Sequence, residues 1–127
     1  MSREQEATQE SLHRQNEVLH MIKIAFDPEK YEIKIKGHAN HGKKGEDIVC
    51  AAVSALFYTL GKALVDSSDM LLEPPICKDE SGNAIISCKP KPEYEGYIAR
   101  SYWTILEGFD FLAKSYEKNV KFKILGA

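Results

Sequence analysis

The sequence is short of cysteine and of net charge, and each shortage excludes a class of protein. Its 127 residues include three cysteines, and 17 basic side chains against 19 acidic ones give a net charge of −2. This balance excludes a broad basic surface for nucleic acid and leaves room only for a local patch, so we expect no direct nucleic-acid partner. Three cysteines without a C-x-x-C spacing do not suit a secreted disulfide scaffold. We expect a cytoplasmic protein with reduced, half-buried thiols at Cys77 and Cys88, which flank a turn and could face each other across a hairpin.

Long apolar runs are also missing. No stretch approaches the roughly 18 consecutive apolar residues of a membrane span. The N-terminus is too polar for a signal peptide, since no apolar run precedes Val18. We therefore expect no membrane partner.

What is present is enough apolar material for one folded domain. Hydrophobic residues make up 43% of the chain and charged residues 28%. Residues 1–20 are dominated by Glu, Gln, Ser and Arg, and we interpret them as a polar extension, helical or disordered. Residues 21–127 are interpreted as a single domain.

The periodicity of the apolar residues predicts seven elements. Alternation of period two indicates strands at 22–27 and 31–36, joined by a turn at 27–30, and at 120–124. Apolar residues at helical spacing predict long helices at 48–65 and 98–116. Short strands are expected at 70–72, before Pro74-Pro75, and at 84–88.

The order β-β-α-β-β-α-β predicts an α+β fold. We expect a two-layer sandwich in which a five-stranded mixed or antiparallel sheet carries both long helices on one face. The lysine-rich alternate positions of the strands then face solvent or a second subunit.

The most informative stretch is Gly37-His38-Ala39, then seven residues, then Asp47-Ile48-Val49-Cys50-Ala51-Ala52-Val53-Ser54. Asp47 is predicted to be the N-cap of the first helix, which places Cys50 in the first turn, where the helix dipole stabilises a thiolate. His38 ends the preceding strand and can supply the basic neighbour. Such a Cys–His pair is suited to nucleophilic attack on a carbonyl, and free N–H groups of the first turn could hold the oxyanion.

Purely structural roles for these residues remain alternatives to a catalytic site. A lone cysteine in an Ala- and Val-rich helix is as often a small core residue. Ser54, one turn after Cys50, either lines the site or lets the helix pack closely. His41 with His38 and Cys50 suggests a metal site, but three or four ligands are normally needed, and we expect neither a metal nor a cofactor.

The loop between the predicted strand 31–36 and the predicted helix 48–65 has few apolar side chains that could pack against the core. We expect it to be mobile and to close over bound substrate. Its residues are Ala39, Asn40, His41, Gly42, Lys43, Lys44, Gly45 and Glu46.

The motif GHA-x7-DIVCAAVS closely resembles the signature of the ribosomal-processing cysteine protease (Prp) family of small bacterial proteins. The resemblance covers nearly all of residues 21–127, and the twelve-residue step from His38 to Cys50 matches the spacing in the family. It implies a homodimeric cysteine endopeptidase that removes a short N-terminal extension from a large-subunit ribosomal protein precursor. Cys50 would be the nucleophile, His38 the general base and acid, and Gly37, Asp47 and Ser54 supporting residues.

The family's substrates carry aromatic residues before the cut, which implies an apolar groove. The sequence does not decide which of its aromatic residues would line such a groove. The candidates are Phe57, Tyr58, Tyr97 and Trp103.

Two other functions compete with proteolysis. The first is a non-catalytic module that binds ribosomal proteins, and the second is a thiol redox sensor at Cys50. All three require a reactive Cys50, and only covalent product formation separates the protease from the others.

Overall fold

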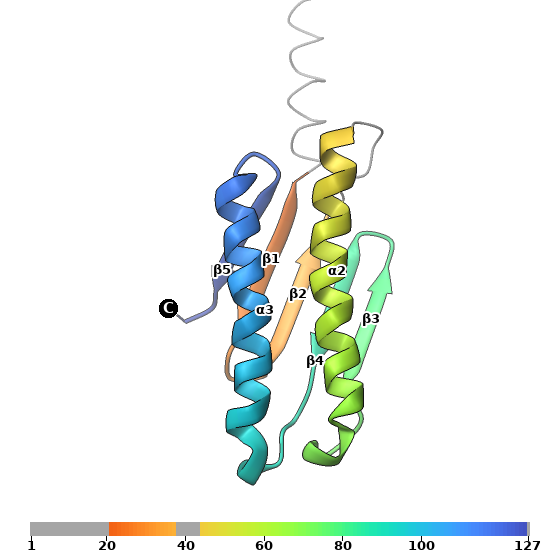
Figure 1. The fold of residues 1–127 in the computed structure, drawn as a ribbon, viewed down its shortest axis with the longest axis vertical. Helices are drawn as coiled ribbons and strands as arrows, with labels where there is room; N and C mark the ends of the chain where they lie inside the picture. The colour runs from red at the N-terminus through yellow and green to blue at the C-terminus, as the bar shows by residue number, and fades with distance from the viewer. Residues whose placement is uncertain (1–20, 38–43, 127) are drawn as a thin grey trace, which may run out of the picture.

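The computed structural model describes residues 21–37 and 44–126, apart from the side chains of residues 44–47. Its longer elements form two layers, in which both helices lie on one face of a five-stranded sheet (Figure 1). This confirms the predicted α+β fold. The elements are β1 (Ile22–Asp27), β2 (Glu32–Lys36), α2 (Lys44–Asp66), the 3-10 turn η1 (Ser68–Met70), β3 (Ile76–Glu80), β4 (Asn83–Ser87), the 3-10 turn η2 (Pro92–Tyr94), α3 (Glu95–Ser115) and β5 (Val120–Ile124).

The strands are arranged in the order β3-β4-β2-β1-β5. Neighbouring strands run antiparallel except β1 and β5, which are parallel. The start of β1 and the end of β2 therefore lie at the same end of the sheet as the tip of the β3–β4 hairpin. The first half of α2 follows at this end, which brings Cys50 close to all three strand ends.

The core lies between the sheet and the helices. The alternation predicted for β1 is observed, because Ile22, Ile24 and Phe26 are buried while Lys23 is exposed. Both helices turn an apolar stripe toward the sheet. The buried residues of these stripes are Val49, Val53, Phe57, Leu60 and Leu64 of α2, and Ile98, Tyr102, Ile105, Leu106, Phe109 and Leu112 of α3.

By length and hydropathy alone, the segment Ile48–Asp66 of α2 would be sufficient to cross a membrane, contrary to the expectation that no stretch approaches a membrane span. The buried stripe of α2 packs against the sheet, so a core helix accounts for the same hydropathy.

The third strand is not where the sequence predicted it. Met70 ends η1, Leu71 makes one isolated bridge with Pro90, and the strand proper is Ile76–Glu80. The prediction at 70–72 was wrong because β3 is an edge strand with all five residues exposed, and such a strand shows no apolar alternation. Its turn to β4 places Ser81 and Gly82 at φ of 32° and 82°, the left-handed conformation that tight two-residue hairpins require.

Candidate active site

Cys50 lines a hollow of about 250 Å³ between α2 and the strand ends beside it. The thiol is half-buried and packs against the hydrophobic core from one side. Ser54 lies one turn further along α2 and lines the same hollow. The remaining lining residues are Ile22, Ile35, Gly37, Val53, Phe57, Asp79, Gly82, Asn83 and Ala84.

Gly37 also lines the hollow, and only glycine fits at this position. Its φ is 102°, and a Cβ at this position would meet the carbonyl oxygen of Met21 at 2.1 Å. Its N–H donates to the carbonyl oxygen of Gly82 at 2.9 Å, which ties the end of β2 to the β3–β4 hairpin. His38 follows this fixed residue directly in the chain.

A side-chain hydrogen bond also joins the β3–β4 hairpin to α2. The hydroxyl of Tyr58 donates to Oδ2 of Asp79 at 2.5 Å. This hydrogen bond and the negative charge of Asp79 raise the pKa of Tyr58 above its ordinary value. Tyr58 is about two turns beyond Cys50 along α2, and Asp79 lines the hollow, so the hydrogen bond holds one wall of the hollow against the helix that carries the thiol.

The start of α2 differs from the prediction. The helix begins at Lys44, so Lys44, Gly45 and Glu46 belong to α2 and not to the expected loop, and Asp47 is the fourth helical residue and not the N-cap. Acidic residues in a first turn favour helix, which explains why Glu46 and Asp47 belong to α2 and not to a loop and an N-cap.

Cys50 is consequently the seventh residue of the helix and lies in its second turn. The predicted place of Cys50 in the first turn, beside the free N–H groups that were expected to hold the oxyanion, is therefore wrong. The helix dipole also acts on Cys50 more weakly than in the first turn.

The structure brings together Cys50, Ser54 and Gly37 of the predicted site. His38 and residues 39–43 lie outside the described residues, as does the side chain of Asp47. Phe57 lines the hollow, whereas Tyr97 and Trp103 are exposed on α3 and do not.

Sequence reasoning missed the contribution of the β3–β4 hairpin. Asp79, Gly82 and Asn83 line the hollow, although the sequence marks them only as turn residues. The long-range contacts at Gly37 and Tyr58, which no local pattern indicates, bring the hairpin there.

The other two cysteines are placed differently from Cys50 and from the predicted pair of half-buried thiols. Cys77 is exposed on β3 and Cys88 is buried just after β4, and neither forms a disulfide. Burial raises the pKa of the Cys88 thiol, and partial burial of the sulfur together with the negative charge of Asp79 raises that of Cys77. The two do not face each other, because Cys77 pairs with Ile86 while Cys88 accepts a hydrogen bond from the hydroxyl of Tyr102 at 3.6 Å.

Within the described part of the chain, no three His, Cys, Asp or Glu side chains converge on a possible metal position. His38 and His41 fall outside that part.

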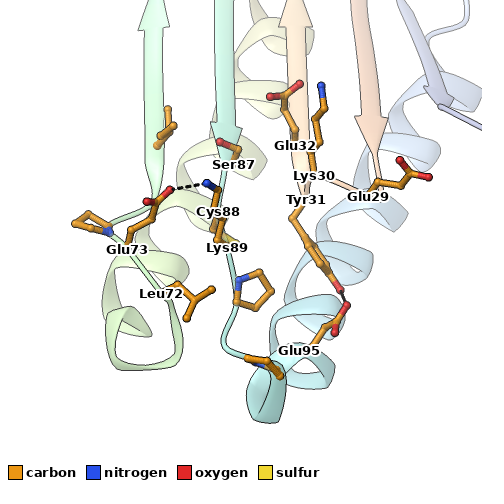
Figure 2. A pocket seen from close by; sticks show the side chains of 14 residues that line it. Glu29, Lys30, Tyr31, Glu32, Leu72, Glu73, Ser87, Cys88, Lys89 and Glu95 are labelled. Carbon is orange, nitrogen blue, oxygen red and sulfur yellow. Dashed lines mark hydrogen bonds and ion pairs between the residues drawn. The ribbon is translucent and has the colours of Figure 1, made fainter.

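A larger hollow, of about 610 Å³, lies at the opposite end of the sheet (Figure 2). The β1–β2 turn, the loop after η1 and the segment after β4 line it. Its polar groups are largely engaged, since Lys89 pairs with Glu73 at 3.4 Å and Tyr31 donates to Glu95 at 3.1 Å. Cys88 lines it as well, but burial raises the pKa of this thiol, so the hollow with Cys50 is the better candidate.

Comparison with known proteins agrees with this choice of site. The model of the family described as Cysteine protease Prp matches residues 21–121, a range that includes Gly37, Cys50 and Ser54. Among curated proteins no match was found.

Solved structures with the same fold include SMU.848 from Streptococcus mutans. It is 26% identical, with a TM-score of 0.65 over 82% of this chain and 93% of that chain. The essential ribosomal processing protease Prp from S. aureus also matches, in complex with a substrate peptide (22% identity, TM-score 0.62) and with a covalently linked product peptide (23% identity, TM-score 0.60). Each of these two matches covers 82% of this chain and 97% of the other.

Proposed function

Since this chain belongs to the cysteine protease Prp family and is a cysteine protease, we propose that it is a ribosomal processing endopeptidase of the bacterial cytoplasm. Its substrate would be the N-terminal extension of a large-subunit ribosomal protein precursor. The observation that carries the proposal is the half-buried Cys50 thiol in a hollow beside the fixed turn at Gly37. The ribosomal processing protease Prp from S. aureus, whose structures contain a substrate peptide and a covalently linked product peptide, supports a peptide substrate.

The proposed chemistry uses Cys50 and His38 as a dyad. His38 takes the thiol proton, and the sulfur attacks the carbonyl carbon of the scissile peptide bond to give a tetrahedral oxyanion. When the oxyanion collapses, the C–N bond breaks, His38 gives the proton to the leaving amine, and a thioester to Cys50 remains. Water, deprotonated by His38, then attacks the thioester and releases the new C-terminus and the Cys50 thiol.

The hollow fits an extended peptide with an apolar side chain. Val53 and Phe57 of α2 and Ile35 of β2 supply apolar lining beside Cys50. Asp47 and Ser54 are proposed as supporting residues, Ser54 from inside the hollow. Residues 39–46 were expected to close over the substrate, and only residues 39–43 remain candidates for that role, since Lys44–Glu46 are helical. We also propose that the protein acts as a homodimer.

The test is to mix the purified protein with the ribosomal protein precursors of its own organism and to record intact masses. We expect one discrete N-terminal loss with the native protein and none with Cys50→Ala. Cys77→Ser is the matched control, because it removes an exposed thiol outside the hollow and keeps nearly the same side-chain size over Gly61, and it should cleave at the native rate.

Other outcomes separate the alternatives. Precursor that co-purifies uncut with the native protein would replace the protease with a binding module. Cleavage that survives in Cys50→Ala would refute the assignment of the nucleophile. A redox sensor is disfavoured, because neither Cys77 nor Cys88 lines the hollow that holds Cys50.

A further inference from the structure

Both helices cover the same face of the sheet and leave the other face uncovered (Figure 1). The uncovered face carries a concentrated positive charge. The strand residues that alternate with the buried ones lie on it, and they include six lysines but only three carboxylates, Asp27, Glu32 and Glu80. The lysines are Lys23, Lys34, Lys36, Lys78, Lys121 and Lys123, and all of them are exposed.

The register places these lysines in rows across the strands. Lys23 lies directly beside Lys36 on one side and beside Lys121 on the other. One step along the strands, Ala25 separates Lys34 from Lys123. A further step brings Asp27 opposite Glu32, so the basic part is the half of the face at the end where Cys50 lies.

Like charges directly opposite each other on neighbouring strands destabilise a sheet. Lysines often protect the edges of sheets from pairing with other chains, which accounts for Lys121 on edge strand β5, but β1 and β2 are interior strands of this sheet. The adjacent pair Lys36 and Lys23 is therefore not explained by folding or by edge protection, and a polyanion that lies across the row would relieve the repulsion.

The uncovered face is also hollowed beside this row. A depression of about 250 Å³ is lined by Lys34, Lys36, Lys78, Glu80, Asn83 and Ile85, among others. No residue of this face in the described strands is aromatic, so it offers ammonium groups to a phosphate backbone and no ring on which a base could stack.

We propose that the basic half of the uncovered sheet face binds the phosphate backbone of double-stranded RNA. The net charge of the whole chain is close to zero and therefore does not reveal this local patch. We now expect a nucleic-acid partner, whereas the sequence alone predicted none. The choice of RNA among polyanions rests on the proposed function, because a ribosomal protein precursor assembled on ribosomal RNA would bring both partners to the enzyme.

The RNA and the peptide substrate can bind the protein at the same time. Lys36 precedes Gly37, and its strand neighbour Asn83 lines the hollow that holds Cys50. The RNA would lie on the open face of this end of the sheet, while the peptide enters between the sheet and α2.

The experiment measures binding of the full chain to an RNA duplex of about 20 base pairs by fluorescence anisotropy at 50 and 200 mM salt. The face variant is Lys23→Gln with Lys36→Gln and Lys121→Gln. The control removes as many charges from exposed positions outside the sheet, as Lys62→Gln with Arg100→Gln and Lys118→Gln. Circular dichroism checks that both variants fold.

We expect the native protein to bind at 50 mM salt and the face variant to bind at least about tenfold more weakly, with its salt slope reduced by about 2 to 3. The control should stay within about twofold of native. Absence of binding at 50 mM salt, or an equal loss in the control, would overturn the proposal. Polyglutamate that binds as tightly as the duplex would overturn RNA as the partner.

Cleavage of a short peptide spanning the precursor's cut site is measured in parallel. The face variant should cleave it at the native rate, because its lysines do not line the Cys50 hollow. RNA binding without any cleavage would refute the proposed function alone, and cleavage without RNA binding would refute this inference alone.

Discussion

At the scale of single residues, Gly37 does the most to fix the site. Its left-handed backbone and its contact with the Met21 carbonyl let the chain turn from β2 toward His38 while its N–H pairs with Gly82. The absence of a side chain at Gly37 is therefore as important for the site as the Cys50 thiol on α2.

We predict that Gly37→Ala destabilises the fold and abolishes cleavage. Strain at the positive φ costs about 1–3 kcal/mol, and the clash with a backbone oxygen adds to it. Thermal unfolding and peptide cleavage measure the two effects. Gly96→Ala is the matched control, because nothing lies within 4 Å of a Cβ there and alanine favours the helix, so its melting temperature should stay or rise. Equal stability of the two variants would contradict the prediction.

Buried Tyr102 and Cys88 make stability depend on alkaline pH. Burial is the main cause that raises the pKa of both groups above their ordinary values of 10.0 and 9.0. The unfolded chain therefore loses these protons first as pH rises, so their contribution is complete below about pH 9 and declines above it.

We predict that the free energy of unfolding is nearly constant from pH 7 to 8.5, declines above about pH 9 and declines more steeply above about pH 10. Urea unfolding at fixed pH values measures it. In Tyr102→Phe the decline above pH 10 should be shallower by up to about 1.4 kcal/mol per pH unit, because one titrating group is removed while the ring remains. A decline as steep as in the native protein would contradict the assignment to Tyr102.

At the scale of elements, the β3–β4 hairpin is the least anchored wall of the site. All five residues of β3 are exposed. The strand is held by its pairing with β4, by the packing of Cys77 over Gly61 of α2, and by the hydrogen bond from Tyr58 to Asp79. The hairpin is therefore the part of the site most able to open for a peptide.

We predict that Tyr58→Phe speeds amide hydrogen exchange in β3 and raises KM for a peptide substrate several-fold, with a smaller effect on kcat. The hydrogen bond that ties the hairpin to α2 is lost, but the thiol is not touched. Hydrogen exchange with mass spectrometry and steady-state kinetics measure the effects.

Two further variants give the controls. Asp79→Asn keeps an acceptor for the Tyr58 hydroxyl and should have a milder effect than Tyr58→Phe. Tyr97→Phe changes an exposed tyrosine on α3, away from the hollow, and should behave as native. Exchange that is unchanged in Tyr58→Phe would show that the hydrogen bond does not hold the hairpin.

At the scale of the whole molecule, one core joins both helices to the sheet. Its buried residues run from Ile22 to Val120, and the family match begins at residue 21. Every described residue of the candidate site lies within this range.

We predict that a chain starting at Met21 folds and cleaves peptide like the full chain. Because every core residue that the structure describes is retained, its melting temperature should differ by no more than about 4 °C, equivalent to less than about 1 kcal/mol. Calorimetry and peptide cleavage test this. A loss of either property would assign residues 1–20 to the domain and contradict the division at residue 21.

The strongly patterned parts of the chain could be predicted from the sequence. The hairpin of β1 and β2, both long helices and β5 were predicted because their apolar residues repeat at the period of the element they form. The motif around Cys50 indicated the protease family for a similar reason, since catalysis fixes residue types at set spacings.

Features without such a repeat could not be predicted. Edge strand β3 buries no side chain and was misplaced, and the start of α2 was mistaken for a cap and a loop because the residues from Lys44 to Asp47 are polar. The predictions for His38 and for the closing of residues 39–43 remain predictions.

The sequence alone determined the class of fold and the family, because periodicity and motif spacing are local properties of the chain. Only the tertiary structure decided which hairpin completes the hollow with Cys50, and that the lysines of three separate strands form one row. Strand order and register bring those residues together, and both result from packing contacts between segments far apart in the sequence.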